Sequence, residues 1–417
     1  MDLSKREEIS KVLKKSDNSK VIAAGWVERT KLMGNLAFIN LRDRTGILQI
    51  VAKGFKELSK LTPESVISVS GTIKQGQKKS GEKELVLDNY EIINKAETPL
   101  PIDMVQDTTQ LDKRMDYRHL DLHNPKIQAI FKIQSEILHA FREFFYRGGF
   151  VEFQTPSIIS SSSEGGTELF EVKYFNQKAY LAQSPQLYKQ MGATSLERVT
   201  MVVPVWRAEK HDTVRHLNES RQMDMEEAFK DEFGVMKRME ECIPFMINEI
   251  NKNCSNELKI LNVELKIPKF KYMDYNEAVK LLKIKNGEDL TPESEKELNR
   301  KFPNTVVFVY DWPLNLKPFY IMPKDNKTAR GFDAIYNGAE ISSGGQRIHL
   351  PDLLTERLKA KGLNPKNFKS YVDSFRHGSP THSGWSIGLE RFTMVLLGLN
   401  NIREAVLFPR DRYRLTP

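Results

Sequence analysis

The spacing of apolar residues changes once along the chain, near Pro125, and this change limits the possible folds. Before it, residues 20–96 form five short alternating runs typical of strands, with one helical piece between the third and the fourth. Three strands, a helix and two strands is the order of a five-stranded OB barrel, a common nucleic-acid-binding module. After it, helical and strand patterns mix without a regular βαβ rhythm, which predicts an α+β domain with an antiparallel sheet.

The chain of 417 residues is long for a single hydrophobic core, so we expect more than one domain. We predict an OB-fold domain over residues 1–100, a hinge rich in proline and charge over 101–125, and a larger α+β domain over 126–417. The larger domain begins with apolar residues at helical spacing, and Gly148-Gly149 predicts the end of that helix.

Composition restricts the cellular setting. The two cysteines, Cys242 and Cys254, are too few for a disulfide framework or a four-cysteine zinc site. No run of about 18 apolar residues could span a membrane, and the charged first residues lack the apolar core of a secretory signal. We therefore expect a cytoplasmic protein without membrane contact. The net charge of +8 suits a polyanionic partner, although such a charge is also common in proteins that bind none.

The run "NLAFINLRD" predicts a strand with two different faces. Ala37, Ile39 and Leu41 form an apolar face, and the opposite face carries Phe38 and Arg42. An aromatic ring and a guanidinium outside the core suit stacking on single-stranded bases and contact with phosphate. A surface ring shielded by a neighbouring loop is the alternative, and this pattern leaves both open.

The stretch "GFDAIYNGAEISSGGQRIH" (residues 331–349) places two acids and an arginine around two turns. Asn337-Gly338 between alternating apolar residues predicts a two-residue hairpin. Regular alternation then puts Asp333 diagonal to Glu340, about 7–8 Å away at the backbone. Two carboxylates at that separation can share a divalent cation, but this segment alone favours an ordinary wet sheet surface.

No Gly-Lys pair occurs in the chain, so a Walker A phosphate loop is excluded. The cationic groups that could bind phosphate come instead from predicted strands and loops. Arg207 and Glu209 lie two residues apart, hence on one face of a strand, and a polar loop with Arg215 and His216 follows. A second strand-like run then reaches Asp224. Arginines in such positions suit bidentate contacts to phosphate or carboxylate groups.

Two predicted helix starts carry further polar groups. In "AQSPQLYKQMG", Ser184 is the predicted cap and Pro185 the first helical residue, which puts Gln186 and Lys189 on one face. Taken alone, this is an ordinary amphipathic surface helix. Near the C-terminus, Arg391 stands at the start of an apolar helix, where an arginine seldom serves packing.

Three stretches together resemble the signature motifs of class II aminoacyl-tRNA synthetases, in order and in spacing. They are "GGFVEFQTPSI" (148–158), "WRAE…RHLNE" (206–219) and "GWSIGLER" (384–391). The OB-like N-terminus, "LDKRMDYRHLDL" and the ending "NIREAVLFPRDRYRLTP" narrow the resemblance to the aspartate, asparagine and lysine subgroup. The likeness covers nearly the whole chain.

Within that subgroup the chain resembles the aspartyl enzymes of the compact archaeal and eukaryotic kind. The resemblance is carried by "SEGGTELFEVKYF", "AQSPQLYKQ", "RQMDMEEAF" and "GAEISSGGQRIH". Asparagine enzymes typically lack a lysine at the place of Lys189, carry glutamate where Asp224 stands, and have no counterpart of "GGQRIH". An asparagine–tRNA ligase, a non-catalytic RNA-binding relative and a free amide-forming ligase are the alternatives, the last disfavoured by the barrel at 20–96.

The resemblance implies an aspartate–tRNA ligase that uses ATP and Mg²⁺. Such an enzyme activates L-aspartate to aspartyl-adenylate, releases pyrophosphate and transfers the aspartate to the 3′ end of tRNA(Asp). Charging of tRNA(Asn) as well stays open. Pro156 matches the proline of the first motif at the family's dimer interface, so a homodimer is expected.

The resemblance also implies roles for individual residues. Catalytic roles fall to Arg207 and Arg391. Aspartate binding falls to Glu164, Ser184, Gln186, Lys189, Arg207, Asp224, Ser343 and Arg347. ATP binding falls to Arg207, Glu209, Arg215, His216, Leu217, Glu340, Gly388 and Arg391. The magnesium ligands are Asp333, Glu340 and Ser343, and the anticodon contacts are Arg29, Lys31, Phe38 and Gln49.

The implied aspartate pocket rests on charge. Lys189 and Arg347 would meet the negative side chain, with Asp224 orienting Lys189. Asparagine in the same place would leave two buried cations short of a partner. Such a mismatch typically costs several kcal/mol, enough for a selectivity of roughly 10⁴.

Three departures from the family pattern bear on activity. Ser220 stands where the second motif often has an aromatic residue, so we expect weaker stacking on adenine. Ser383 and Ser386 replace residues that are commonly glycine in the third motif, and Ser386 either crowds the substrate or adds a hydroxyl beside it. Glu28 places an acid on the barrel surface where anticodon selectivity is set.

Overall fold

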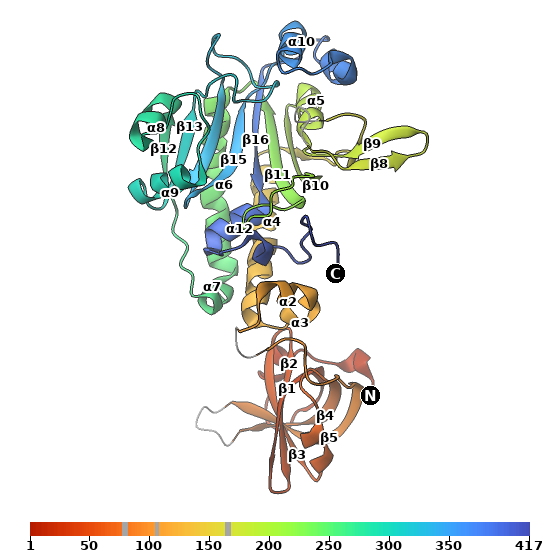
Figure 1. Cartoon of the computed structure of the whole chain (residues 1–417). Coiled ribbons are helices and arrows are strands. Elements are labelled where there is room, and N and C mark those ends of the chain that lie inside the picture. The colour runs from red at the N-terminus through yellow and green to blue at the C-terminus, as the bar shows by residue number, and fades with distance from the viewer. Residues whose placement is uncertain (77–81, 105–107, 163–167) are drawn as a thin grey trace. The chain divides into compact units, whose positions relative to one another are not determined.

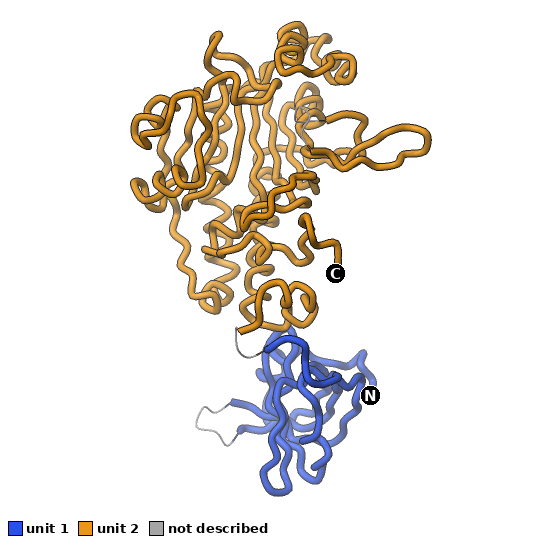
Figure 2. The backbone as a smooth tube through the Cα atoms, in the orientation of Figure 1, with its two compact units in different colours: residues 1–103 blue, residues 104–417 orange. Residues whose placement is uncertain are grey.

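The computed structural model describes residues 1–76, 82–104, 108–162 and 168–417. The chain forms two compact units, Met1–Asp103 and Met104–Pro417 (Figure 2). Glu164, which was expected to bind the substrate, lies outside the described residues. Within the described ranges, no helix is long and apolar enough to cross a membrane.

The first unit is a closed five-stranded barrel, as predicted, with strands paired in the order β1-β2-β3-β5-β4 (Figure 1). The strands are β1 (Lys20–Met33), β2 (Leu36–Asp43), β3 (Gly46–Lys53), β4 (Val66–Gln75) and β5 (Lys83–Asn94), with the short helices η1 (Leu3–Lys5), α1 (Ile9–Val12) and η2 (Lys56–Lys60). Along β2, Ala37, Ile39 and Leu41 are fully buried, whereas Phe38 is half-buried. The alternation therefore separates the barrel core from an outer face.

The second unit is built on an eight-stranded sheet in the order β12-β13-β14-β15-β16-β11-β10-β6. The strands pair antiparallel except for β12 with β13 and β10 with β6, so the predicted α+β class is confirmed. The strands are β6 (Val151–Glu152), β10 (Arg198–Trp206), β11 (Glu219–Ala228), β12 (Lys269–Asp274), β13 (Thr305–Tyr310), β14 (Gly331–Tyr336), β15 (Ala339–Gln346) and β16 (His382–Gly388). A small separate sheet joins β7 (Ile158–Ile159), β9 (Gln177–Leu181) and β8 (Glu171–Tyr174).

Helices α4 (Pro125–Arg147) and α6 (Glu232–Asn253) pack on one face of the large sheet (Figure 1). Helix α4 ends at Arg147 with Gly148 as its C-terminal cap, so the predicted stop at Gly148-Gly149 is confirmed. Met223 and Met225 of β11 are buried in the core with these helices. Because side chains alternate along a strand, Asp224 between them points to the opposite face, where the candidate site lies.

The second unit contains further helices. They are α2 (Leu111–Asp116), α3 (Arg118–Asp121), α5 (Gln186–Leu196), α7 (Ser255–Leu261), α8 (Tyr275–Leu282), α9 (Pro292–Lys301), α10 (Pro351–Ala360), η3 (Pro365–Phe368), α11 (Lys369–Ser374), α12 (Leu389–Leu397) and η4 (Ile402–Ala405). Helices α2 and α3 fall within the stretch predicted as a hinge. The guanidinium of Arg118 in α3 is fully buried and donates to the carbonyls of Val406 and Leu407, which attaches this stretch to the second unit.

The hairpin of β14 and β15 turns at Asn337-Gly338, and both turn residues have positive φ, as the two-residue turn requires. Ile335 pairs with Glu340 as expected. A β-bulge then inserts Ile341, so Asp333 pairs with Ser343. The strict alternation expected along this hairpin therefore fails at the bulge, which shifts the register by one residue, although the charge of Asp333 still acts on Glu340.

Candidate active site

One cavity of the second unit collects most of the side chains that the sequence singled out there. It is lined by Ser184, Gln186, Lys189, Arg207, Glu209, Arg215, His216, Leu217, Asp224, Glu340, Ser343, Arg347, Gly388 and Arg391. Asp333 is not a lining residue, but it pairs with one: Lys317 Nζ lies 2.5 Å from Asp333 Oδ2. Side chains that are far apart in the sequence of this unit thus line one cavity.

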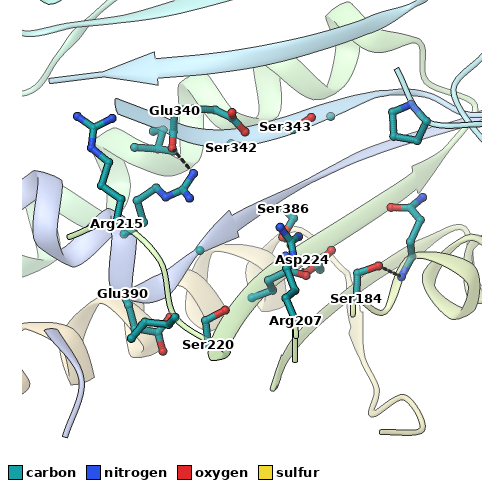
Figure 3. A pocket seen from close by; sticks show the side chains of 18 of the residues that line it. Ser184, Arg207, Arg215, Ser220, Asp224, Glu340, Ser342, Ser343, Ser386 and Glu390 are labelled. Atoms are coloured by element: carbon teal, nitrogen blue, oxygen red, sulfur yellow. Dashed lines mark hydrogen bonds between the residues drawn. The ribbon is translucent and has the colours of Figure 1, made fainter. Parts of the chain in front are cut away.

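Three neighbouring strands of the large sheet line the cavity. Strand β11 supplies Ser220 and Asp224, and Ser386 of β16 lies beside Asp224 (Figure 3). Strand β15, which pairs with the other side of β16, supplies Glu340 and Ser343 (Figure 3). One end therefore carries the paired acids of the hairpin, and the other carries the groups around Asp224.

Helix α5 presents Gln186 and Lys189 to this cavity. The helix begins at Gln186, one residue later than predicted, with Pro185 at the cap position. Ser184 still serves the helix start, because its Oγ accepts from the backbone N–H of Gln186 at 3.3 Å. The side chain of Lys189 is 1% exposed, so the surface-helix interpretation of this segment is wrong.

Four charged groups interlock at the Asp224 end. Lys189 Nζ lies 2.7 Å from Asp224 Oδ1 and 3.6 Å from Glu226 Oε2. Arg347 donates to Glu226 through Nε at 2.9 Å and through Nη2 at 3.2 Å. Burial alone would raise the pKa of the Glu226 carboxyl, but Arg347 and Lys189 hold that pKa below its ordinary value. Both cations therefore have carboxylate partners inside the protein.

Sequence reasoning missed Glu226, although a signal was present. It stands two residues after Asp224 in the same strand, so alternation puts both carboxylates on one face. Its place also explains Gly384, which pairs with Glu226 across β11 and β16. A Cβ at Gly384 would lie 2.1 Å from Glu226 Oε2, so a side chain there would displace the carboxylate from Arg347.

Ser386 contributes a hydroxyl to the same cluster. Its Oγ donates to Asp224 Oδ2 at 3.0 Å, while Lys189 holds Oδ1. Ser383, the other serine in place of a glycine, donates to the backbone carbonyl of Lys230 and does not line the cavity wall. Of the two outcomes expected for Ser386, the structure thus provides an added hydroxyl bonded to Asp224.

The paired acids at the hairpin end carry crowded negative charge. Burial, and then the charge of Asp333, raise the pKa of the Glu340 carboxyl to about 7. Lys317 partly offsets this charge and lies over the Trp312 ring, 4.1 Å from its centre. Two carboxylates and the hydroxyl of Ser343 form an all-oxygen donor set, which fits Mg²⁺ held by few protein ligands together with a phosphate-bearing substrate.

The basic residues expected at the triphosphate already have partners. Arg215 donates to Glu295 Oε2 at 2.8 Å and to the Gly338 carbonyl at 3.0 Å, and Arg391 donates to the Glu340 carbonyl at 3.1 Å. Arg207 is more open, because its side chain is 45% exposed and its nearest acid, Glu209, is 3.8 Å away. Glu295 lies on the distant helix α9, and no sequence pattern connected it with this site.

The four residues expected on the barrel surface also lie together. Arg29, Lys31, Phe38 and Gln49 line one cavity of the first unit. Gln49 donates to Glu84 Oε2 at 3.1 Å, and Asn40 donates to Glu28 Oε2 at 3.3 Å. The unexpected acid Glu28 is therefore bonded to Asn40, another residue of that cavity.

Each of the two units matches a model of a known protein family. A family model described as tRNA synthetases class II (D, K and N) matches residues 110–412. A second model, described as OB-fold nucleic acid binding domain, matches residues 21–93. Together they cover the barrel and nearly all of the second unit.

Individual relatives match over nearly their full length. The chain is 43% identical to an aspartate–tRNA(Asp/Asn) ligase of Methanothermobacter thermautotrophicus, over 96% of both chains. It is 44% identical to an aspartate–tRNA(Asp) ligase of Pyrococcus horikoshii, over 98% of both. Among solved structures, asparaginyl-tRNA synthetase from Pyrococcus horikoshii with asparaginyl-adenylate superposes with a TM-score of 0.92 at 32% identity, over 99% of both chains. Aspartyl tRNA synthetase from Entamoeba histolytica gives 0.87 at 32% identity, over 99% of this chain and 93% of that one.

Proposed function

Because the chain belongs to the class II tRNA synthetases of the D, K and N group, we propose that it is an aspartate–tRNA ligase. It activates L-aspartate with ATP to aspartyl-adenylate, releases pyrophosphate and transfers the aspartate to the 3′ end of a tRNA. The observation that carries the choice of amino acid is the buried cluster of Lys189, Arg347, Asp224 and Glu226.

The donors left over in this cluster favour a carboxylate. Within the described chain, Asp224 and the Trp385 carbonyl take two of the three N–H donors of Lys189. Glu226 takes Nε and Nη2 of Arg347. One N–H of Lys189 and the Nη1 group of Arg347 remain for a ligand, and neither side chain can accept a hydrogen bond.

This arrangement changes the physical reason for discrimination. The two cations do not lack partners when asparagine enters, as the sequence had suggested, because Asp224 and Glu226 already neutralise them. Instead, the amide nitrogen of asparagine would meet an N–H donor where aspartate offers an oxygen. A buried donor facing a donor leaves both groups unsatisfied, and sites of this kind reject analogues by roughly 10⁴-fold.

Aspartate- and asparagine-dependent ATP–pyrophosphate exchange tests the proposal. We expect exchange with aspartate and little with asparagine. Exchange with asparagine alone would replace the proposed function by that of an asparagine–tRNA ligase, whose fold this chain shares. Tight tRNA binding without any exchange would identify a non-catalytic relative.

The opposite end of the cavity suits ATP. We propose that Arg207 clamps the α-phosphate and the substrate α-carboxylate, so that the two meet in line. Arg391, His216 and Arg215 contact the adenine and the outer phosphates, and Glu209, Leu217 and Gly388 complete the ATP site. Asp333, Glu340 and Ser343 hold Mg²⁺, which when bound offsets negative charge on the triphosphate and the leaving pyrophosphate. The protein then acts by position and charge, with no nucleophilic side chain.

The barrel surface is the proposed anticodon site, with Phe38 as a stacking platform. Replacing Phe38 with alanine should weaken aminoacylation at limiting tRNA about 5- to 100-fold, because stacking of one base contributes about 1–3 kcal/mol. Tritium- or carbon-labelled aspartate transferred to tRNA gives the measurement. ATP–pyrophosphate exchange should stay unchanged, and Ile92→Ala, at an exposed apolar position outside this cavity, should leave both reactions unchanged. Equal losses in both reactions would argue against an anticodon role.

The acceptor range, the assembly and the compartment are also proposals. The tRNA partner is tRNA(Asp), and charging of purified tRNA(Asp) and tRNA(Asn) with labelled aspartate measures whether the second is also used. We propose a homodimer through the surface at Pro156. In the neighbouring sequence, Tyr146 is 79% exposed and Val151 and Ile158 are both 45% exposed. Light scattering coupled to gel filtration reports the mass. The buried free thiols of Cys242 and Cys254 suit the reducing cytoplasm.

The hydroxyl of Ser386 is expected to contribute to aspartate affinity. Replacing Ser386 with alanine removes the donor to Asp224 Oδ2 and should raise the KM for aspartate about 3- to 10-fold, since one such bond contributes about 1 kcal/mol. Glycine at 386 should behave like alanine, whereas glycine would outperform alanine if Cβ crowded the substrate. Ser383→Ala is the matched control, because Ser383 donates to the Lys230 carbonyl. The KM for ATP should stay constant in all three variants.

A further inference from the structure

A chain of buried polar groups runs behind the proposed aspartate site. Gln186 Nε2 donates to Gln190 Oε1 at 2.8 Å, and the Tyr371 hydroxyl donates to the same oxygen at 2.7 Å. Gln190 Nε2 lies 3.0 Å from His382 Nε2, and His382 Nδ1 lies 3.0 Å from the Pro380 carbonyl. Gln190 and His382 are completely buried, so these bonds are shielded from water.

The Pro380 carbonyl, at the end of this series of hydrogen bonds, determines which group donates and which accepts in each of them. A carbonyl can only accept, so His382 Nδ1 carries the proton that it shares with Pro380. Burial lowers the pKa of His382, which keeps the ring neutral and leaves Nε2 as an acceptor. Gln190 must therefore turn its NH₂ group to His382, and its oxygen is left to receive Gln186 and Tyr371.

The hydrogen bond to Gln190 Oε1 fixes the orientation of the Gln186 amide. Its nitrogen is turned to Gln190, away from the cavity that Gln186 lines. Among the described residues, the nitrogen has a side-chain partner and the oxygen has none. The cavity is thus offered an amide oxygen, which accepts from an ammonium group and repels a carboxylate.

We propose that Gln190 and His382 are positioning residues that hold the Gln186 amide oxygen toward the α-ammonium group of the amino-acid substrate. The inference rests on the proposed function, since it concerns the same amino-acid site. The Phe375 ring stacks on His382 with centres 5.6 Å apart and holds the imidazole in its plane. The remaining donors of Lys189 and Arg347 thus bind the side chain of the substrate. The hydrogen-bonded groups of Gln186, Gln190 and His382, which we call the relay, orient the acceptor for its ammonium group.

A double-mutant cycle in the full-length protein tests whether Gln190 acts through Gln186. The variants are Gln186→Leu, Gln190→Leu and the double variant, measured by aspartate-dependent ATP–pyrophosphate exchange. We expect Gln186→Leu to raise the KM for aspartate about 10-fold, because it removes a hydrogen bond to a charged group. Gln190→Leu should raise it about 5- to 10-fold, and the double variant should be no worse than Gln186→Leu. The KM for ATP should not move.

A second pair of variants covers the case in which leucine at 190 prevents folding. His382→Gln supplies an amide oxygen that can accept from Gln190, and it should keep the KM for aspartate within about 2-fold of the parent. His382→Leu cannot accept and should match Gln190→Leu. Ser383→Ala, which removes a buried hydrogen bond next to His382 but outside the relay, is the control and should behave like the parent.

The outcomes separate the inference from its premise. No aspartate-dependent exchange in the parent protein overturns the proposed function. An active parent whose double variant shows the product of the two single effects, about 50- to 100-fold, overturns the relay alone. Equal behaviour of His382→Gln and His382→Leu overturns it as well, because a merely structural histidine would not distinguish an acceptor from a non-acceptor.

Discussion

Replacing Lys189 with leucine is expected to abolish aspartate-dependent ATP–pyrophosphate exchange while ATP binding stays nearly intact. The ammonium lies 2.7 Å from Asp224 Oδ1 and keeps one donor for the substrate carboxylate. Without it, Asp224 and Glu226 would face that carboxylate with only Arg347 to oppose them. A loss of roughly 10²- to 10³-fold or more in kcat/KM for aspartate is expected, since breaking a buried charge pair costs about 3–5 kcal/mol.

The same substitution threatens folding, so a compensated variant is required. Lys189→Met combined with Asp224→Asn restores the charge balance of the buried cluster and should recover part of the lost stability. It should remain inactive with aspartate, because the second cation is still missing. Thermal unfolding and nucleotide binding are measured beside exchange. Aspartyl-adenylate formation at a rate comparable to the parent, in either variant, would contradict the role of Lys189 in binding the aspartate side chain.

Replacing Glu340 with glutamine should reduce exchange about 10²- to 10³-fold. The carboxylate is one of two acids at the proposed metal site, and charge stabilisation of this kind contributes several kcal/mol to a transition state. The affinity of the nucleotide-free protein for Mn²⁺, measured from the signal of the free ion, should decrease in parallel. Glu297→Gln on the exposed face of α9 is the control and should change neither quantity.

The stability of the Glu340→Gln variant provides a second readout. The folded pKa of Glu340 is about 7, above the ordinary value of 4.5, so the parent loses stability as the pH rises from about 4.5 to 7. Glutamine has no such titration. In the absence of metal, the variant should therefore be more stable than the parent at pH 8, by roughly 1–3 kcal/mol, and the difference should shrink toward pH 5. A variant that is less stable at pH 8 would show that Glu340 is well compensated without a metal.

Local sequence chemistry predicted much of the framework. Asn337-Gly338 predicted the hairpin turn, and Gly148-Gly149 predicted the end of α4, because turn and cap residues act through their own φ angles. Alternation predicted the buried and outer faces of β2. The start of α5 was misplaced by one residue, since Ser184 reaches the first N–H from outside the helix.

The site residues and the pairing of Lys189 with Asp224 were predicted by resemblance, whereas the other charged partners were not. Glu226 was within reach of the alternation argument and was overlooked. Glu295 and Lys317 carried no signal, because each meets its partner, Arg215 or Asp333, only through the packing of α9 and of the segment before β14. The bulge at Ile341 was hidden as well, since a bulge is a property of two paired strands.

The sequence by itself determined the elements of this protein, since periodicity, caps and turns depend on residues a few positions apart. The tertiary structure alone decided which charges in the cavity are already neutralised and which donors remain. Those pairs join residues 35, 121 and 162 positions apart, Lys189 with Asp224, Arg347 with Glu226, and Ser386 with Asp224. The register of β11, β15 and β16, together with the packing of α5 on β11, brings them within hydrogen-bonding distance. Hydrogen-bond donors can be counted only when every acceptor is in place.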